Sequence, residues 1–403
     1  MSKRQLFIKE IMADYRRSIP DESHAAMLED LHGRLMSVAT QAVNKAELQL
    51  FGSYVSRFCK PTSDADFSLV YRNFSPWLIG IAKVDIANAK RLARFAKIAT
   101  EAGFSNPKFI QAKIPVVQCV DPGGGVPCDV SIGNVGGVEN SKILGKIRDL
   151  HPDVIGAYVH TIKEWGKARE FIAPEKQMFN SFTVTTMAIM VLQELAIVPV
   201  FHKTTGECGE VTLADAEEKL DAWTVPDVYA RLSKDEDIGE GVFFLLQKFA
   251  EYYSKFDFKT GTVSLICPRR IRPIYHEVSS IYLNRHAEIK RAKWVDHHRD
   301  HFNEVGAFSE EDLSEAMANE ESQRPHASPF VVEDLVNYIN SGRRVTAARV
   351  PHVHSELQRL YDILHKEDVV TVKELMQPSN KLPRFSNFEG SGVIGKREMS
   401  FSK

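Results

Sequence analysis

The stretch FGSYVSRFCKPTSDADFSLVY, residues 51–71, decides which fold this chain is expected to adopt. Its opening triplet Phe-Gly-Ser is separated by ten residues from the triplet Asp64-Ala65-Asp66. Residues 64–71 alternate between polar and apolar side chains, which predicts a strand with Asp64 and Asp66 on one face. Taken alone, an Asp-x-Asp pattern is more often a solvated strand face than a binding site.

A third aspartate lies in a second predicted strand, residues 125–133 with the sequence GVPCDVSIG. Its apolar side chains alternate with Asp129 and Ser131, which places Asp129 on the polar face. If the two strands pair, Asp129 joins Asp64 and Asp66, and three crowded carboxylates raise one another's pKa unless cations lie between them. Hard divalent cations that carry substrate phosphates, Mg²⁺ above all, meet this need.

The Phe-Gly-Ser triplet adds an element that can bind phosphate. Gly52 allows a ligand to approach the backbone closely, and its N–H can hold a phosphate together with the N–H and hydroxyl of Ser53. A turn that binds triphosphate, placed before a strand that binds metal, predicts a site for nucleotidyl transfer.

Length and composition supply the frame for this site. The chain has 403 residues, which predicts two or more domains. Its 51 Lys plus Arg and 53 Asp plus Glu give a net charge of −2, so a polyanionic partner would meet local basic patches. Five cysteines without CxxC spacing indicate neither a zinc knuckle nor a disulfide framework.

Neither the most apolar segment nor the N-terminal segment has the pattern of a membrane or targeting sequence. The most apolar run, residues 182–200, is interrupted by Gln193 and Glu194, so no transmembrane segment is predicted. Residues 1–18 combine basic and apolar side chains at helical spacing, but Glu10 and Asp14 make them a poor transit peptide. An ordinary N-terminal helix is the better interpretation.

The remaining segments alternate between strands and helices. A helix is expected from an N-cap at Asp85 to a stop at Gly103, with a buried stripe made of Ile86, Ala89, Ala93 and Ala96. Residues 108–120 and 125–133 are predicted strands around the turn DPGGG, which is expected to be a flexible hairpin. Helices are predicted at 142–149, 154–170, 181–196, 213–222 and 238–254.

Together, FGS, DAD and the third aspartate in VPCDVSIGN resemble the signature of the DNA polymerase β-type nucleotidyltransferase superfamily. Further along, NVGGVENSKIL, HTIKEWGKAR, NSFTVTTMAIMVLQ and IGEGVFFLLQKFAEYYSKFDF resemble, in order, segments of noncanonical poly(A) polymerases and terminal uridylyltransferases. The resemblance covers about residues 45–300. In its compactness and its flanking sequence, the chain most resembles the mitochondrial terminal uridylyltransferases of trypanosomes, including the kind associated with an editosome-like complex.

This resemblance implies an α+β fold, with a nucleotidyltransferase catalytic domain built on a mixed sheet and a mostly helical poly(A)-polymerase-associated domain. The implied organisation is an N-terminal helical segment (1–44) that could pack on either domain, the catalytic domain (45–140), the helical nucleotide-binding domain (141–300), a C-terminal helical extension (301–375) and a flexible tail (376–403).

The resemblance also implies roles for individual residues. Asp64, Asp66 and Asp129 would be the catalytic carboxylates that bind the metal ions, Mg²⁺ or Mn²⁺. The nucleotide-binding residues would be Gly52, Ser53, Ser63, Asn140, Ser141, Lys163, Lys167, Ser181 and Phe182. Lys163 and Lys167 are four residues apart on a predicted helix, so both can reach one triphosphate; a solvated helix face is the alternative for this pair, and a core position is the alternative for Phe182.

One segment departs from the uridylyltransferase pattern. Relatives specific for UTP commonly carry an acidic pair around a proline near the end of the associated region, whereas SLICPRRIRP has Cys267 before the proline and Arg269 and Arg270 after it. UTP preference therefore follows from the overall resemblance, not from these residues. His297 and His301 form a possible zinc pair that no nearby cysteine completes, and a basic or merely solvated helix is the better interpretation.

The function expected from the resemblance is Mg²⁺-dependent transfer of UMP from UTP to an RNA 3′-hydroxyl with release of pyrophosphate. The expected partners are RNA with a free 3′-hydroxyl, UTP and a mitochondrial RNA-editing protein complex, with no membrane, and the expected location is the mitochondrion. Two alternatives stay open: an ATP-using poly(A) polymerase of the same fold, and a noncatalytic RNA-binding subunit descended from such an enzyme.

Overall fold

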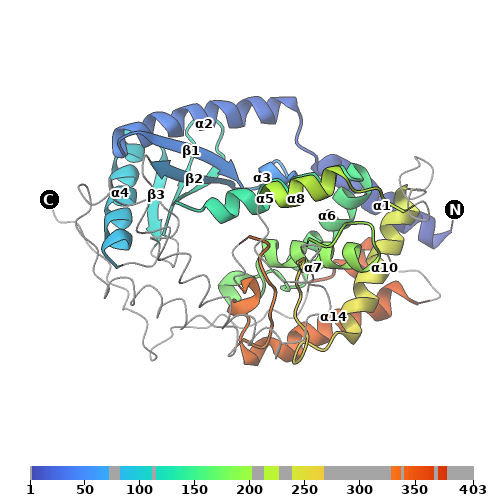
Figure 1. Ribbon diagram of the computed structural model, residues 1–403. Helices are drawn as coiled ribbons and strands as arrows, with labels where there is room; N and C mark the ends of the chain where they lie inside the picture. The colour runs from blue at the N-terminus through green and yellow to red at the C-terminus, as the bar shows by residue number, and fades with distance from the viewer. Residues whose placement is uncertain are drawn as a thin grey trace.

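The computed structural model of the chain describes residues 2–71, 82–110, 115–201, 213–226, 238–266, 328–336, 340–366 and 371–378. The segment Cys267–Arg270, the histidines His297 and His301, and nearly all of the predicted tail lie outside these ranges. Figure 1 shows a sheet with its helices on one side of the molecule and a group of packed helices on the other.

A five-stranded mixed sheet carries the decisive stretch of sequence. Its strands are β1 (Ala46–Phe51), β2 (Ala65–Tyr71), β3 (Ser105–Ile110), β4 (Val116–Val120) and β5 (Pro127–Ile132), arranged in the order β1-β2-β5-β4-β3. Strands β2 and β5 pair in parallel, and the other neighbours pair antiparallel. The predicted mixed sheet and α+β fold are confirmed.

The apolar face of the sheet is covered by two helices, α2 (Glu22–Ala42) and α4 (Ala82–Glu101). The side chains packed there share the inward positions of their strands or helices and include Leu31, Leu35, Phe67, Leu69, Leu92, Phe95, Cys128 and Val130. Because side chains alternate along a strand, Asp66 and Asp129 belong to the opposite face. The hydrophobic core thus fixes the sheet and leaves the carboxylate face for other elements.

Helix α4 differs from its predicted form. It begins at Ala82, so Asp85 lies in its first turn and is not its N-cap. Ile86, placed on the predicted buried stripe, is 57% exposed, whereas Leu92 and Phe95 are fully buried. The bulky side chains gain more from burial than the alanines at positions 89, 93 and 96, which are only partly buried, and they set the rotation of the helix.

The predicted strand 108–120 is two antiparallel strands, β3 and β4. The hairpin between β4 and β5 is confirmed, but its turn is held in place and is not a loose loop. Asp121 is 2% exposed and accepts three hydrogen bonds of 2.8–3.0 Å from Arg34 of α2. A Cβ atom on Gly124 would lie 2.5 Å from the sulfur of Met27, so the glycine permits close packing against α2.

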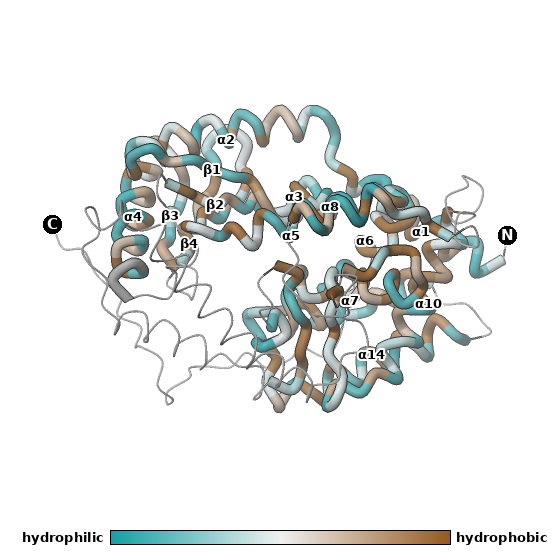
Figure 2. The backbone as a smooth tube through the Cα atoms, in the orientation of Figure 1, coloured by the Kyte–Doolittle hydropathy of each residue, from teal (hydrophilic) through white to brown (hydrophobic). Residues whose placement is uncertain are grey.

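The second part of the molecule is helical. Its longer helices are α5 (Val135–Asp149), α6 (Pro152–Ala168), α7 (Ser181–Glu194), α8 (Leu213–Asp221), α10 (Ile238–Lys255) and α14 (Val350–Leu364), with shorter elements α15 (Val372–Leu375), η2 (Pro174–Lys176), η5 (Ser341–Arg344) and η6 (Ala347–Arg349). The five predicted helices are present; α5 begins earlier than predicted because Asn134 caps it. In Figure 2, α8 is mainly hydrophilic, whereas hydrophobic residues recur along α6 and α10.

The N-terminal segment is divided between the two parts. Helix α1 (Lys3–Ser18) buries Phe7, Ile11 and Tyr15 in the helical core. Helix α2 instead packs on the sheet, as described above. Among the described residues, no helix is long and apolar enough to cross a membrane. The sequence left open which part this segment packs on, and the structure places α1 on the helical core and α2 on the sheet.

Candidate active site

The structure brings Asp66 and Asp129 together on the polar face of the sheet. The two residues are directly paired in the parallel register of β2 and β5, and neighbouring strands lie about 4.8 Å apart. Asp64 precedes β2 and is exposed to solvent. The three carboxylates thus stand at the amino-terminal ends of two adjacent strands.

Burial and mutual repulsion perturb these carboxylates. Burial, followed by the charges of Asp129 and Asp64, raises the pKa of Asp66 from 3.8 to about 7. Burial also raises the pKa of Asp129, although Gln118 donates hydrogen bonds of 3.1 Å to both of its carboxylate oxygens and opposes this shift. The protein holds negative charge here at a cost that a cation would remove.

An oxygen-only donor set with raised pKa values fits a hard divalent cation such as Mg²⁺. Within the described ranges, however, no three His, Cys, Asp or Glu side chains are already gathered as a metal site. The exposed Asp64 would have to turn toward Asp66 and Asp129 to complete one. The residues therefore suit metal binding in kind and in charge, and the pair Asp66–Asp129 is the part already in place.

Gly52 fits closely against Asp66. Its φ is +72°, a conformation that favours glycine, and a Cβ atom there would lie 2.2 Å from Oδ2 of Asp66. The N–H of Gly52 donates to Oγ of Ser141 at 2.7 Å, so in this structure it is not directed at a free phosphate position. Ser53 begins the short helix α3 (Ser53–Ser56) and is partly exposed.

Two polar residues of α5 lie beneath this turn. Ser141 accepts from Gly52 and donates to the carbonyl of Gly137 at 2.6 Å. Asn140 is 3% exposed and donates through Nδ2 to the carbonyl of Gly136, while its Oδ1 has no hydrogen-bond partner among the described residues. A buried acceptor without a partner is costly and marks a position where a ligand hydroxyl or water could donate.

The two predicted triphosphate lysines occupy different environments on α6. Lys163 is 9% exposed and donates to the carbonyl of Phe58 at 2.6 Å. Burial and the neighbouring charge of Lys167 lower the pKa of Lys163 to about 8, and the charge of Lys163 opposes the rise in the pKa of Asp66. Lys167 is more exposed and lies 3.6 Å from Glu164. Lys163 is thus electrostatically coupled to the carboxylates, and Lys167 lies farther out.

Ser63 lies in the loop between α3 and β2 and orders that loop. Its Oγ accepts from the N–H of Lys60 at 2.9 Å, and its carbonyl accepts from the hydroxyl of Tyr54 at 3.0 Å. Tyr54 also contacts His24 of α2 through its hydroxyl. In this structure Ser63 therefore acts as a positioning residue for the loop.

Ser181 and Phe182 lie in the first turn of α7, which Asn180 caps by accepting from the N–H of Thr183 at 2.8 Å. Both residues are partly buried, and Phe182 packs against the helical core. The ring is neither fully buried nor fully exposed, so both the core and the stacking interpretations agree with its position.

The loop at residues 330–336 and 340–345 is a feature that the sequence did not predict. Thr183 at the start of α7 donates to the carbonyl of Ser341 at 3.1 Å, which places the loop beside Ser181 and Phe182. The loop contains the acidic pair Glu333-Asp334, and the charge of Asp334 helps to raise the pKa of Glu139, after the larger effect of burial. The charge of Asp334 thus reaches α5 at Glu139, the residue directly before Asn140.

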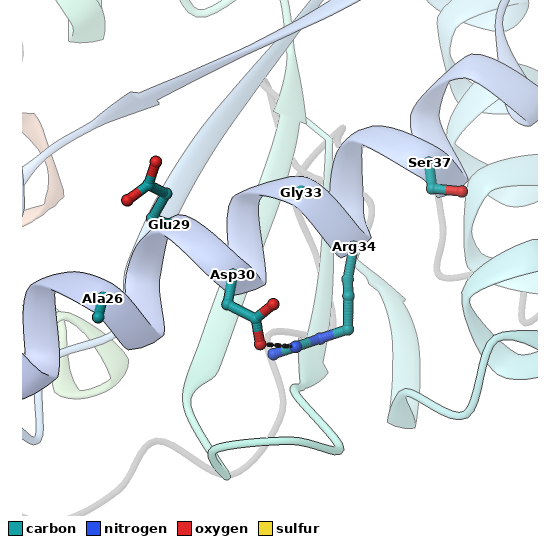
Figure 3. Close-up of a pocket in the computed structure, with 6 residues that line it drawn as sticks. All are labelled: Ala26, Glu29, Asp30, Gly33, Arg34 and Ser37. Atoms are coloured by element: carbon teal, nitrogen blue, oxygen red, sulfur yellow. Dashed lines mark hydrogen bonds and ion pairs between the residues drawn. The ribbon is translucent and has the colours of Figure 1, made fainter.

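A pocket elsewhere on the molecule contains none of these residues. It lies on the outer side of α2 and is lined by Ala26, Glu29, Asp30, Gly33, Arg34 and Ser37 (Figure 3). Asp30 and Arg34 form an ion pair within it, and Arg34 also binds Asp121. These contacts explain the pocket as part of the packing of α2 on the β4–β5 turn.

Comparison with known proteins finds similarity of this chain to poly(A) RNA polymerases. Residues 7–148 match the family model of the central palm domain of mitochondrial-like poly(A) RNA polymerase. The chain is 27% identical over 229 residues to poly(A) RNA polymerase GLD2-B of Xenopus laevis, covering 56% of this chain and 43% of that protein. It is 24% identical over 248 residues to protein HESO1 of Arabidopsis thaliana, covering 58% and 46%. The chain thus spans less than half the length of these relatives.

Solved structures extend the similarity of fold to nearly the whole chain. A cytoplasmic RNA terminal U-transferase superposes with a TM-score of 0.63 at 16% identity, covering 94% of this chain and 100% of the other. The Cid1 poly(U) polymerase with bound MgGTP superposes with a TM-score of 0.64 at 16% identity, with the same coverage. At this level of identity the match establishes the fold.

Proposed function

Because the chain has the fold of the poly(A)/poly(U) polymerase type of nucleotidyltransferase, we propose that it transfers a nucleotide from a nucleoside triphosphate to the 3′-hydroxyl of RNA, and that UTP is its preferred substrate. Pyrophosphate is the second product. The observation that carries this proposal is the paired position of Asp66 and Asp129, beside the Gly52 turn and within the field of Lys163.

In the proposed reaction, Asp64, Asp66 and Asp129 would hold Mg²⁺ or Mn²⁺, which supplies charge stabilisation at the attacking and leaving oxygens. The chain's own contribution is positional. Gly52 leaves room for the Asp66 carboxylate, and Ser141 fixes the backbone of that turn. Asp129, held by Gln118, would lie nearest the RNA 3′-hydroxyl.

The helical part would hold the nucleotide. Lys163 and Lys167 would bind the triphosphate, since they are four residues apart on α6 and the charge of Lys163 acts on Asp66. Oδ1 of Asn140, which has no partner within the described part of the chain, could accept a hydrogen bond from a ribose hydroxyl, and such a contact favours ribonucleotides over deoxyribonucleotides. Ser181 and Phe182 would contact the base.

The choice between UTP and ATP depends on groups that read the edge of the base. The Cid1 structures are described as a poly(U) polymerase, whereas GLD2 is named a poly(A) polymerase, so the comparisons support both substrates. Asp334, whose charge acts on Glu139 next to Asn140, is a carboxylate that could accept a hydrogen bond from the N3–H of uracil. Because the N6 amine of adenine can donate in the same way, the preference for UTP rests on the resemblance to uridylyltransferases. An ATP-using polymerase is the second candidate, motivated by the GLD2 relatives.

The resemblance to trypanosome mitochondrial enzymes extends the proposal to a cellular role. We place the chain in mitochondrial RNA editing or processing, as part of a protein complex. Localisation of the tagged full-length protein and identification of copurifying RNA would test this part separately from the enzymatic activity.

The experiment that tests the activity offers UTP, ATP, CTP and GTP separately to the purified protein with a short RNA and Mg²⁺, and follows extension of the 3′ end. We expect UTP to be incorporated far more efficiently than ATP, CTP or GTP. Asp66→Ala and Asp129→Ala should lower the rate by about a thousandfold or more, because charge stabilisation in the transition state is lost. Asp221→Ala, which removes an exposed carboxylate of α8, is the control.

Each other outcome has a defined meaning. Incorporation of ATP as well as or better than UTP would identify the protein as a poly(A) polymerase. Absence of incorporation with several RNAs would favour the noncatalytic RNA-binding subunit. Near-normal activity of both aspartate variants would refute the catalytic assignment.

A further inference from the structure

A third lysine joins the two predicted triphosphate lysines. Lys60 lies in the loop between α3 and β2, and its Nζ is 2.9 Å from Oε2 of Glu164. The other carboxylate oxygen of Glu164 is 3.6 Å from Nζ of Lys167. Glu164 thus bridges Lys60 and Lys167, and its charge also acts on Lys163, the residue before it on α6.

The electrostatic couplings show that these groups form one cluster. The charges of Lys60, Lys167 and Glu164 all act on Lys163, and Lys163 acts on Asp66. Lys60 and Lys167 lower the pKa of Glu164 against the effect of burial. His160, one turn earlier on α6, also senses Glu164 and Lys60. The three lysines and Glu164 alone carry a formal charge of +2 next to the carboxylate face.

The backbone of Lys60 is fixed by hydrogen bonds, whereas its ammonium group can change partners. Its N–H donates to Ser63, and its carbonyl accepts from the hydroxyl of Tyr54 at 3.3 Å. The ammonium group, by contrast, is held by Glu164 in a partly exposed pair, with side-chain exposures of 29% and 25%. Such pairs are worth only about 0–1 kcal/mol, so an anion of higher charge can replace the carboxylate.

We propose that Lys60 is a third triphosphate-binding residue and that Glu164 is the internal anion which the triphosphate displaces from Lys60 and Lys167. This inference rests on the proposed function. In the nucleotide-free protein, Glu164 keeps the two lysines in place and prevents mutual repulsion of the cluster. When triphosphate or pyrophosphate binds, its oxygens accept hydrogen bonds from the ammonium groups of Lys60 and Lys167, and Glu164 turns toward solvent.

The proposal predicts opposite effects for two substitutions. Lys60→Ala removes a donor to the phosphates and should raise the KM for UTP and the inhibition constant of inorganic pyrophosphate about tenfold, with little change in the KM for RNA. Glu164→Gln removes the competing charge but keeps an oxygen that can accept from Lys60. It should lower both constants about three- to tenfold.

Two substitutions in matched ion pairs serve as controls. Lys146→Ala removes a lysine of similar exposure, 33%, that lies 3.1 Å from Asp221. Glu251→Gln neutralises a carboxylate that bridges Lys248 and Lys255 at 2.9 and 3.2 Å, the same arrangement on α10. Both controls should leave the constants for UTP and pyrophosphate unchanged.

Binding of UTP and of pyrophosphate, measured by calorimetry with Ca²⁺ in place of Mg²⁺, separates the two levels of the argument. If the wild-type protein binds neither anion and extends no RNA, the proposed function itself fails. If the wild type binds both but Lys60→Ala binds them equally well, or Glu164→Gln binds them more weakly, only the assignment of Lys60 and Glu164 is refuted. A rise in the KM for RNA alone would also overturn it, in favour of an RNA contact.

Discussion

The ionised carboxylate of Asp66 lowers the stability of the folded protein, and substitution by asparagine should restore that stability. Burial and the charges of Asp129 and Asp64 raise its pKa from 3.8 to about 7 in the folded protein. The folded state therefore binds this proton more tightly than the unfolded state, and stability falls as the pH rises from about 4 to about 7. Above this window the ionised carboxylate costs on the order of 4 kcal/mol as an upper limit.

The quantity to measure is the stability gained by Asp66→Asn at one pH minus the stability gained at another. This difference cancels the packing effects of the new side chain, which are the same at both pH values. At pH 5 part of the cost is already present, so the stability gained by Asp66→Asn should be larger at pH 8 than at pH 5 by about 2–3 kcal/mol. The assay is urea unfolding of metal-free protein in EDTA at both pH values. Addition of Mg²⁺ should stabilise the wild type more than the variant.

Glu47→Gln provides the matched control for this experiment. Glu47 is an exposed carboxyl on β1, the strand next to β2, and a surface substitution of this kind is expected to stay within about 0.5 kcal/mol. If Asp66→Asn changed stability equally at pH 5 and pH 8, or gained more at pH 5, Asp66 would not be the strained carboxylate described here.

The remaining predictions concern positions with other physical causes. Gly52→Ala should reduce both activity and thermal stability, because the new Cβ atom would lie 2.2 Å from Asp66 at a φ of +72°. Gly33→Ala in α2, where the new Cβ atom meets nothing within 4 Å, should instead stabilise the protein by about 0.5–1 kcal/mol. Equal melting temperatures for the two variants would contradict this. Arg169→Ala should cost about 3–5 kcal/mol in chemical unfolding, because it leaves the buried carboxylate of Glu356 without its 2.7 Å partner, and simultaneous apolar replacement of both residues should recover most of the loss.

Local patterns in the sequence were enough to locate the strands that carry the site. The alternation in residues 64–71 and 125–133 reports directly on which side chains face the core, and the glycine-rich turn between β4 and β5 has a strong hairpin signal. These signals act within a few residues. The alternation places Asp66 and Asp129 on the polar face of their strands, and the parallel pairing of β2 with β5, which the sequence left as a condition, brings them side by side.

Prediction failed where distant packing overrides local pattern. The alanine stripe of α4 suggested a buried face, but the sheet and α2 select the face with Leu92 and Phe95. The break between β3 and β4 was missed although Pro115 lies directly before β4, and a proline inside a predicted strand argues against one continuous strand. The acidic pair Glu333-Asp334 was missed since its position beside α7 depends on a contact between Thr183 and Ser341, which are 158 residues apart.

The Gly52 turn shows why a motif identifies a site more easily than it explains one. The sequence suggested that the N–H of Gly52 holds phosphate, yet the structure directs that N–H to Ser141, 89 residues away, and uses the missing side chain to admit Asp66. Both tasks require glycine, so the sequence alone cannot distinguish them. A phosphate that bound the turn would compete with Ser141, just as the triphosphate would compete with Glu164 for Lys60. In this structure the N–H of Gly52 and the ammonium group of Lys60 thus both have internal acceptors, and nucleotide binding would proceed by exchange of these partners.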